Sequence, residues 1–285
     1  DIADLWDGSG QPTDLSLLPT PPIAWYRMGD NGAYKSPQWL LPSNENKDKV
    51  SNYSFEFDGV DDKVELGAQS LGITGAISVS AWVKIPTTNT GGGGTNIQEI
   101  VCEDRTSGTN RNWTLYWRGG GLNQISGVIW DSAGSAVAAT TTAIVPNDNQ
   151  WHHVMFTYTG DTSTDGLKLF VDGIQRAQGT SANGGTRATT AVVPTIGGLS
   201  NVISWMFEGN IDEVSIFNTD QSANVSTIYN SGIPNDLTEL SPLHWYRMGE
   251  DASFDGTNWT VPDNVGSNDG TSDGMMVDAL VGEAP

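Results

Sequence analysis

The chain has 285 residues, and 34 acidic side chains against 13 Lys and Arg give it a formal net charge of -21. Such an excess of negative charge repels nucleic-acid phosphates and anionic membrane surfaces, so no nucleic-acid partner is expected. No stretch approaches the roughly 20 apolar residues of a membrane-spanning helix, so no membrane insertion is expected either. The length suits one all-β domain, which commonly takes about 200–250 residues.

Predicted strands alternate with polar and glycine-rich loops in the first half of the chain. Residues 31–54 are rich in Asn, Ser and Lys and are expected to form a loop, as are residues 89–96 with their four consecutive glycines. Strands are predicted at residues 55–67 and 77–85, and a hairpin is predicted from residues 112–117 and 124–130. The single cysteine, Cys102, cannot form an internal disulfide and is expected to be a small buried side chain on a strand.

The clearest signal is a hairpin in residues 151–173. Residues 151–158 are rich in aromatic and β-branched side chains, and apolar residues alternate from Leu167 to Val171, so two strands flank a polar loop. The first of these strands carries large apolar groups on both faces, which is typical of a strand that is covered on both sides. It is therefore expected in the middle of a sheet.

A closing strand is predicted at residues 207–218, and helix is confined to a turn or two at residues 222–229. A chain of many short strands with little helix is typical of the all-β class. The predicted architecture is an antiparallel jelly-roll β-sandwich.

Four blocks in this order resemble the laminin-G-like domain of the concanavalin A-like lectin/glucanase superfamily. They are residues 55–67, 77–85, 151–173 and 207–232, which read FEFDGVDDKVELG, ISVSAWVKI, WHHV to FVDG and FEGNIDEVSIFN to IYNSG. The resemblance implies a sandwich over residues 23–234, as in tandem-repeat extracellular proteins or bacteriophage structural proteins. It implies a fold more than a function, because one fold hosts many activities.

A repeat flanks this predicted domain. The sequence PIAWYRMGD at residues 22–30 returns as PLHWYRMGE at residues 242–250. Residues 1–22 are therefore interpreted as the tail of a preceding repeat or a linker, and residues 235–285 as a linker and the lead-in strand of a following repeat. A lead-in strand without its own domain has unpaired backbone groups, which favours self-association or pairing with neighbouring repeats of the same protein. A disordered or cropped C-terminal segment is the alternative.

No catalytic residues are predicted. Glucanases of the superfamily place carboxylates on alternate residues of one strand, in an E-x-D-x-x-E pattern. Asp212 and Glu213 are adjacent here and so point to opposite faces. His152 and His153 are adjacent too and cannot share a metal from one strand, so structural roles are expected for both.

A structural calcium site is a hypothesis of the sequence. Asp58, Asp61 and Asp62 lie in one tight turn, and hard oxygen ligands suit calcium. The family resemblance implies that Asp58 and Asp212 share an ion that ties the first strand to the closing strand. In the alternative, Asp58 makes the turn and its acidic neighbours are solvated surface charges.

A sugar-binding platform is a second hypothesis. Eleven tryptophans are many for this length, and Trp113, Trp117 and Trp130 fall in the hairpin beside Arg118. Sugars stack on exposed aromatic faces, although aromatic side chains on strands usually belong to the core.

Three functions compete at this point. The first is a non-enzymatic structural or assembly module of an extracellular fibre or virion surface, with adhesion to surface glycans as an added role. The second is a carbohydrate- or receptor-binding lectin-like module, and the third is a glycan-active enzyme. The repeated lead-in favours the first.

Overall fold

The computed structural model describes most of the chain after residue 50. It covers the backbone of residues 33–35 and 38–40, then residues 51–67, 69–92, 96–105, 111–140, 145–161, 166–179, 187–200 and 202–285, with the backbone alone for 137–140. The tail predicted at residues 1–22 lies outside these residues.

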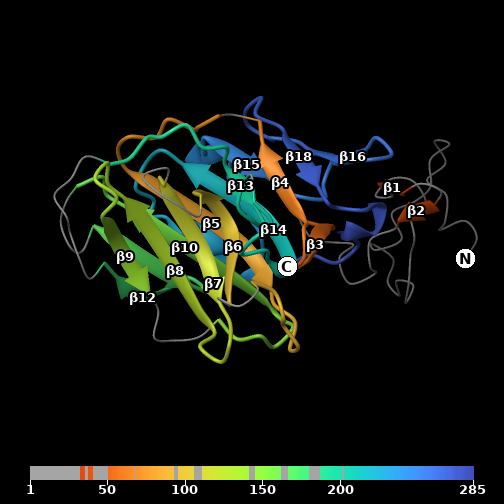
Figure 1. Ribbon diagram of the computed structural model, residues 1–285, viewed down its shortest axis with the longest axis horizontal. Helices are drawn as coiled ribbons and strands as arrows, with labels where there is room; N and C mark the ends of the chain where they lie inside the picture. The colour runs from red at the N-terminus through yellow and green to blue at the C-terminus, as the bar shows by residue number, and fades with distance from the viewer. Residues whose placement is uncertain are drawn as a thin grey trace, which may run out of the picture.

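The fold is a sandwich of two antiparallel sheets, which confirms the predicted class (Figure 1). In spatial order the first sheet contains β12 (Ile174–Gln178), β11 (Leu167–Val171), β10 (Trp151–Tyr158), β5 (Ile77–Lys84), β14 (Glu208–Phe217), β3 (Ser54–Asp58) and β19 (Leu280–Val281), with β15 (His244–Tyr246) paired to β14. The second sheet contains β16 (Ser253–Phe254), β17 (Trp259–Val261), β18 (Gly270–Asp273), β4 (Lys63–Leu66), β13 (Thr195–Ile196), β6 (Ile97–Glu103), β7 (Trp113–Arg118), β8 (Gln124–Trp130) and β9 (Ala136–Thr140). β1 (Ala33–Lys35) and β2 (Gln38–Leu40) form a separate two-stranded sheet inside the stretch predicted as a loop.

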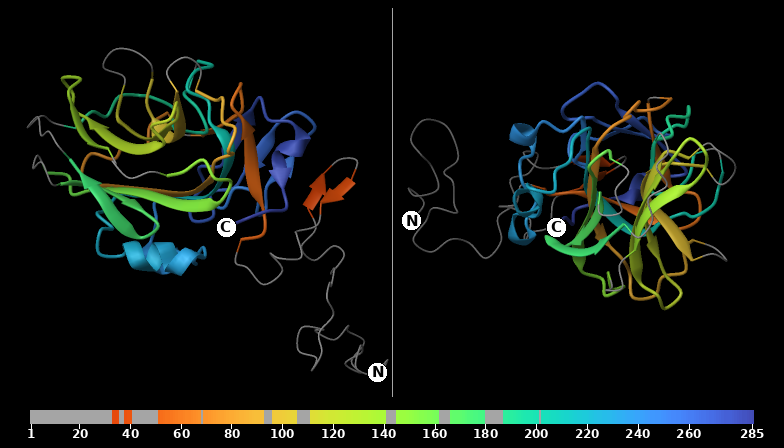
Figure 2. Two further views of the ribbon diagram at one scale, coloured as in Figure 1. Left: turned by 90° about the horizontal axis from the view of Figure 1, so that it is seen from below. Right: turned by 90° about the vertical axis from the view of Figure 1, so that its left-hand side faces the viewer.

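The predicted central hairpin is confirmed, because β10 pairs with β11 on one side and with β5 on the other. The two faces of β10 contribute side chains to different hydrophobic clusters. Phe156 faces the main core between the sheets, whereas Met155 belongs to a second cluster on the outer face of the first sheet. That outer face is covered by α1 (Val225–Tyr229) and the 3-10 turns η5 (Asn230–Gly232) and η6 (Thr238–Leu240), which lie beneath the sheet in the left view of Figure 2.

The first and closing strands of the predicted domain pair directly. β3 runs antiparallel to β14 with Asp58 opposite Glu208 and Phe55 opposite Ile211. The ladder between β14 and β5 is interrupted between Asp212 and Ser215, where Glu213 has a φ of 48°. At this irregularity two adjacent acidic side chains, Asp212 and Glu213, are both buried.

The C-terminal segment completes both sheets. β15 pairs with β14, β18 pairs with β4, and β19 pairs with β3 after the 3-10 turn η7 (Val277–Ala279). Trp259 is 1% exposed, and its ring centroid lies 5.1 Å from that of Phe55. The backbone groups of these strands therefore find partners inside the chain, contrary to the expectation of an unpaired lead-in strand.

Candidate functional site

Two of the predicted sugar-stacking residues lie in the core. Trp113 and Trp117 are 0% and 1% exposed and face inward from β7. Each indole N–H is satisfied internally, by Glu103 at 2.7 Å and by the Val145 carbonyl at 3.0 Å. Alternate strand residues share a face, and this face of β7 lies against the other sheet. These two side chains therefore do not form a sugar platform.

The third tryptophan, Trp130, is half-buried at the end of β8. The Arg111 guanidinium lies 3.7 Å from the centroid of its ring, and Arg111 also makes two parallel hydrogen bonds to Asp104 at 2.8 Å each. Arg118 is exposed at the opposite end of β7, so the structure joins Trp130 to Arg111 and not to Arg118. The ion pair with Asp104 and the stacking on Trp130 hold the Arg111 guanidinium in one orientation, and both side chains are partly exposed.

A buried acid marks the outer face of the second sheet. Thr114 lies between the inward-facing Trp113 and Leu115, so it points outward, and its hydroxyl donates to the fully buried Glu99. The other oxygen of Glu99 has no hydrogen-bond partner among the described residues. Burial, helped by Asp104, holds the pKa of Glu99 well above its usual range, which favours the neutral acid.

The acidic turn between β3 and β4 gathers three carboxylates, those of Asp58, Asp61 and Asp62. One oxygen from each lies within 4.8 Å of the others. Asp58 accepts the Val60 N–H at 2.7 Å, and Asp62 accepts the Asp58 N–H at 3.0 Å. Burial and the neighbouring Asp58 raise the pKa of Asp62 to about 6. Calcium takes about six to eight oxygens, so these side chains supply about half of a coordination shell.

Asp212 does not join this turn. The β3–β14 register sets Asp58 opposite Glu208, and Asp212 is four residues further along β14, a distance of roughly 13 Å at the usual strand rise. The predicted calcium pair of Asp58 and Asp212 is thus not brought together. The sequence shows two acidic residues on two paired strands, but it does not show the register between them.

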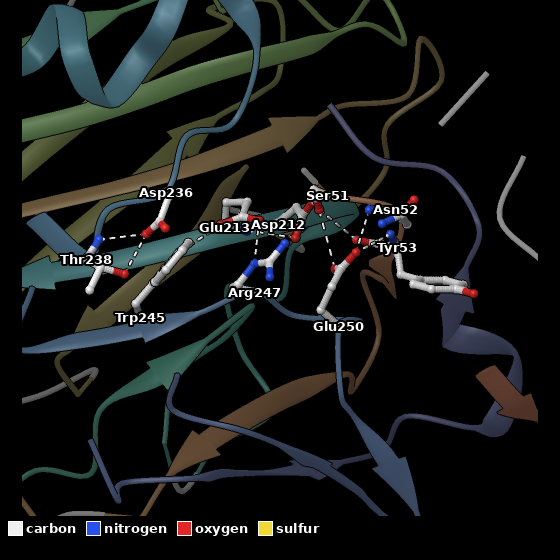
Figure 3. Close-up of polar contacts among 10 residues, drawn as sticks. All are labelled: Ser51, Asn52, Tyr53, Asp212, Glu213, Asp236, Thr238, Trp245, Arg247 and Glu250. Atoms are coloured by element: carbon white, nitrogen blue, oxygen red, sulfur yellow. Dashed lines mark hydrogen bonds and ion pairs between the residues drawn. The ribbon is translucent and has the colours of Figure 1, made fainter. Parts of the chain in front are cut away.

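Asp212 belongs instead to a buried polar cluster at the junction of β14, β3 and the C-terminal segment (Figure 3). The Ser51 hydroxyl donates to Asp212 at 2.8 Å, and Glu250 accepts the backbone N–H groups of Asn52 and of Tyr53, the latter at 3.2 Å. Burial raises the pKa of Asp212 well above its usual range, with Glu213 and Glu250 adding to the effect.

The same cluster holds the C-terminal segment through Glu213. Its carboxylate accepts the Trp245 indole N–H at 2.7 Å and the Arg247 guanidinium at 3.2 Å. Burial raises the pKa of Glu250 to about 7. Every carboxylate of this cluster accepts a hydrogen bond from the chain itself, so its evident chemistry is the anchoring of one segment on another. The sequence signal that could have found it is the WYRMG repeat, which contains both Trp245 and Arg247.

The paired histidines have different surroundings, as expected for adjacent strand residues. His152 forms a 2.9 Å contact with Asp172, and this hydrogen bond raises its pKa. His153 is buried against Trp82 and Tyr229, and burial lowers its pKa to about 4. They do not share a site.

Within the described residues, no helix is both long and apolar enough to cross a membrane.

Comparison with known proteins agrees with this architecture. A family model described as the concanavalin A-like lectin/glucanases superfamily, of the laminin G type, matches residues 58–224. Among solved structures, a candidate carbohydrate-binding protein from Bacteroides ovatus aligns with a TM-score of 0.59 and 15% identity, over 81% of this chain and 59% of that one. The chain thus spans 59% of that protein's length.

Two further alignments with solved structures have TM-scores below 0.5. A heptameric SAP-like pentraxin from Limulus polyphemus aligns with a TM-score of 0.49 and 15% identity, over 76% of this chain and 94% of that one. Domains LG4-5 of the mouse laminin alpha1 chain align with a TM-score of 0.42 and 14% identity, over 60% of this chain and 43% of that one. The search of curated proteins finds no match.

Proposed function

The chain belongs to the concanavalin A-like lectin/glucanases superfamily, and from this membership we propose that it is a non-enzymatic binding module of an extracellular assembly, a fibre or a virion surface. Its partners in this proposal are further units of its own kind. The observation that carries the proposal is that the WYRMG lead-in occurs twice in the sequence, at residues 25–29 and 245–249, and that the second copy pairs with β14. A module whose sequence repeats its lead-in is suited to being joined to a neighbour.

The role of the buried carboxylates supports a non-enzymatic function. Asp212, Glu213 and Glu250 receive hydrogen bonds from Ser51, Trp245 and the Asn52 backbone, so they hold two parts of the chain together. A retaining glycosidase instead needs two carboxyl groups about 5–5.5 Å apart that face a sugar.

Light scattering of the full chain at increasing concentration and salt tests the assembly proposal. Units that each carry a net charge of -21 repel one another, and salt screens this repulsion, so the average mass is expected to rise between low and high ionic strength. A chain that stays monomeric under all these conditions would count against assembly. Deleting residues 240–285 is not a suitable test, because it removes the buried Trp245, Tyr246 and Trp259.

Glycan binding is the second candidate, and the Arg111–Trp130 pair favours it. A half-buried indole beside a fixed guanidinium offers an apolar face and hydrogen-bond donors, the combination that sugars use. The description of the Bacteroides ovatus protein as carbohydrate-binding points the same way. A glycan array probed with the full chain tests it, and binding that survives Trp130→Ala would place the glycan elsewhere.

A further inference from the structure

The repeat extends beyond the WYRMG motif into local structure. β1 and β2 pair Tyr34 with Trp39, and β16 and β17 pair Phe254 with Trp259. Each residue of the second hairpin lies 220 positions after its counterpart in the first, as do the two copies of WYRMG. The chain therefore contains two lead-ins of the same length and hairpin register: the N-terminal lead-in, residues 23–41, and the C-terminal lead-in, residues 243–261.

The sandwich has a defined seat for one of them. The C-terminal lead-in lies along Val214, Ser215 and Ile216 of β14, binds Glu213, and places Trp259 against Phe55. We call these five residues of β14 and β3 the lead-in seat. In the seated copy, four large side chains are at most 5% exposed, namely Trp245, Tyr246, Met248 and Trp259.

The N-terminal lead-in repeats the large side chains that the seat buries. The four buried side chains have identical counterparts in Trp25, Tyr26, Met28 and Trp39. Arg27 corresponds to Arg247, so the partner of Glu213 is preserved as well. The copies differ at the exposed Thr260, whose counterpart is Leu40. They also differ at the buried Val261 and the partly buried Glu250, whose counterparts are Leu41 and Asp30. Identity at the four largest buried side chains is what a common binding surface requires.

We propose that the lead-in seat binds the N-terminal lead-in of a second copy of this chain, in place of the C-terminal lead-in, and so links units head to tail. This inference rests on the proposed assembly role and names its contact surface. A contact between two different surfaces repeats from unit to unit, and it gives a ring where the rotation closes and a filament where it does not. The incoming strand would pair with the edge of β14 that β15 covers in the single chain, so the linkage is an exchange of one added strand for another.

A second copy fits this exchange better than the chain's own N-terminal lead-in. After its seated hairpin, the C-terminal lead-in needs residues 262–281, with β18 and β19, before Val281 pairs with Ser54 at the start of β3. The N-terminal lead-in is joined to Ser51 by residues 42–50 alone, a connection less than half as long. A lead-in that arrives from another chain can leave β18 and β19 in place.

The C-terminal lead-in occupies the seat in a single chain because it is covalently connected to the sandwich that contains the seat. A tethered segment has an effective concentration in the millimolar range, well above that of a second chain in dilute solution. Exchange is therefore expected to increase with protein concentration and whenever the C-terminal lead-in is weakened.

Disulfide trapping in the full chain tests the exchange. Thr260 and Thr271 are exposed cross-strand partners, so Leu40 of an incoming lead-in would lie opposite Thr271, within disulfide reach. The variant carries Leu40→Cys and Thr271→Cys, with Cys102→Ala to remove the native thiol. Mild oxidation is expected to give covalent dimers and higher species on a non-reducing gel. The matched control, Thr260→Cys with Thr271→Cys, is expected to give an internal bond in monomers.

Two substitutions set the direction of the effect. Trp259→Ala weakens the seated copy. Where the parent gives few cross-linked dimers, this variant is expected to raise the dimer fraction more than about tenfold. Trp39→Ala weakens the incoming copy and is expected to abolish the cross-linked dimers. If the Trp259 variant does not fold, the double-cysteine variant with Trp259 intact is oxidised at rising protein concentration instead. Its cross-linked dimer fraction is then expected to rise. Monomers alone, or an internal bond between positions 40 and 271, would overturn the proposal. Light scattering reports association through any surface, so assembly without this cross-link would refute the exchange and leave the proposed function standing.

Discussion

Replacing Glu250 with glutamine is expected to make the protein less sensitive to alkaline pH. Burial raises the pKa of this carboxyl from 4.5 to about 7, so the folded state retains a proton that the unfolded chain has lost. Stability from this group is complete below the unfolded pKa and is lost as pH rises towards 7. The gap corresponds to about 3 kcal/mol, most of which falls between pH 5 and pH 8.

Glutamine keeps the acceptor oxygen for the backbone N–H groups of Asn52 and Tyr53 but has no charge to bury. Urea unfolding of both proteins at pH 5 and pH 8 measures the effect. The loss of unfolding free energy between these pH values is expected to be about 2–3 kcal/mol smaller in Glu250→Gln than in the parent. Glu239→Gln removes the same charge from an exposed site and serves as the control. An unchanged pH dependence in Glu250→Gln would show that another group titrates, and the reasoning about this cluster would be wrong.

Three further outcomes are expected. Trp259→Ala should lower the free energy of unfolding by about 3–5 kcal/mol, because it removes a buried ring that packs against Phe55. Trp130→Ala should lower it less, and equal losses in chemical denaturation would contradict the placement of Trp259 in the core. Calcium should raise the melting temperature by binding the acidic turn, and Asp61→Asn should remove that shift; melting curves that coincide with calcium and with chelator would leave the turn without an ion. Glycan-array signals should disappear in Trp130→Ala while the melting temperature changes little, and a retained signal would exclude the Arg111–Trp130 surface.

Local sequence patterns predicted the strands well because their signals are local. The alternation from Leu167 to Val171 and the aromatic run from Trp151 to Tyr158 each specify a strand, and the loop between them specifies the pairing. Apolar groups on both faces of β10 correctly indicated a strand covered on both sides, since Met155 and Phe156 enter different clusters.

The site residues were harder to predict because they depend on contacts between distant segments. Trp113 and Trp117 share a face by their spacing, but spacing does not say whether that face meets the core or the solvent. Asp58 and Asp212 lie on strands that do pair, yet the register separates them. The contacts of Glu213 with Trp245 and Arg247 join segments more than thirty residues apart, and no periodicity predicts them.

Closure of this sandwich depends on a late part of the chain. β15, β18 and β19 belong to residues 244–281, and they cover edges of β14, β4 and β3 that the preceding sequence leaves open. A ribosome must therefore release nearly all of these residues before either sheet is complete, and the pairing of Val281 with Ser54 spans almost the whole described chain. Folds with such distant contacts form slowly, and their open edges pair readily with other strands in the meantime. When many chains are synthesised close together, neighbouring copies would therefore meet while their sheet edges are still uncovered.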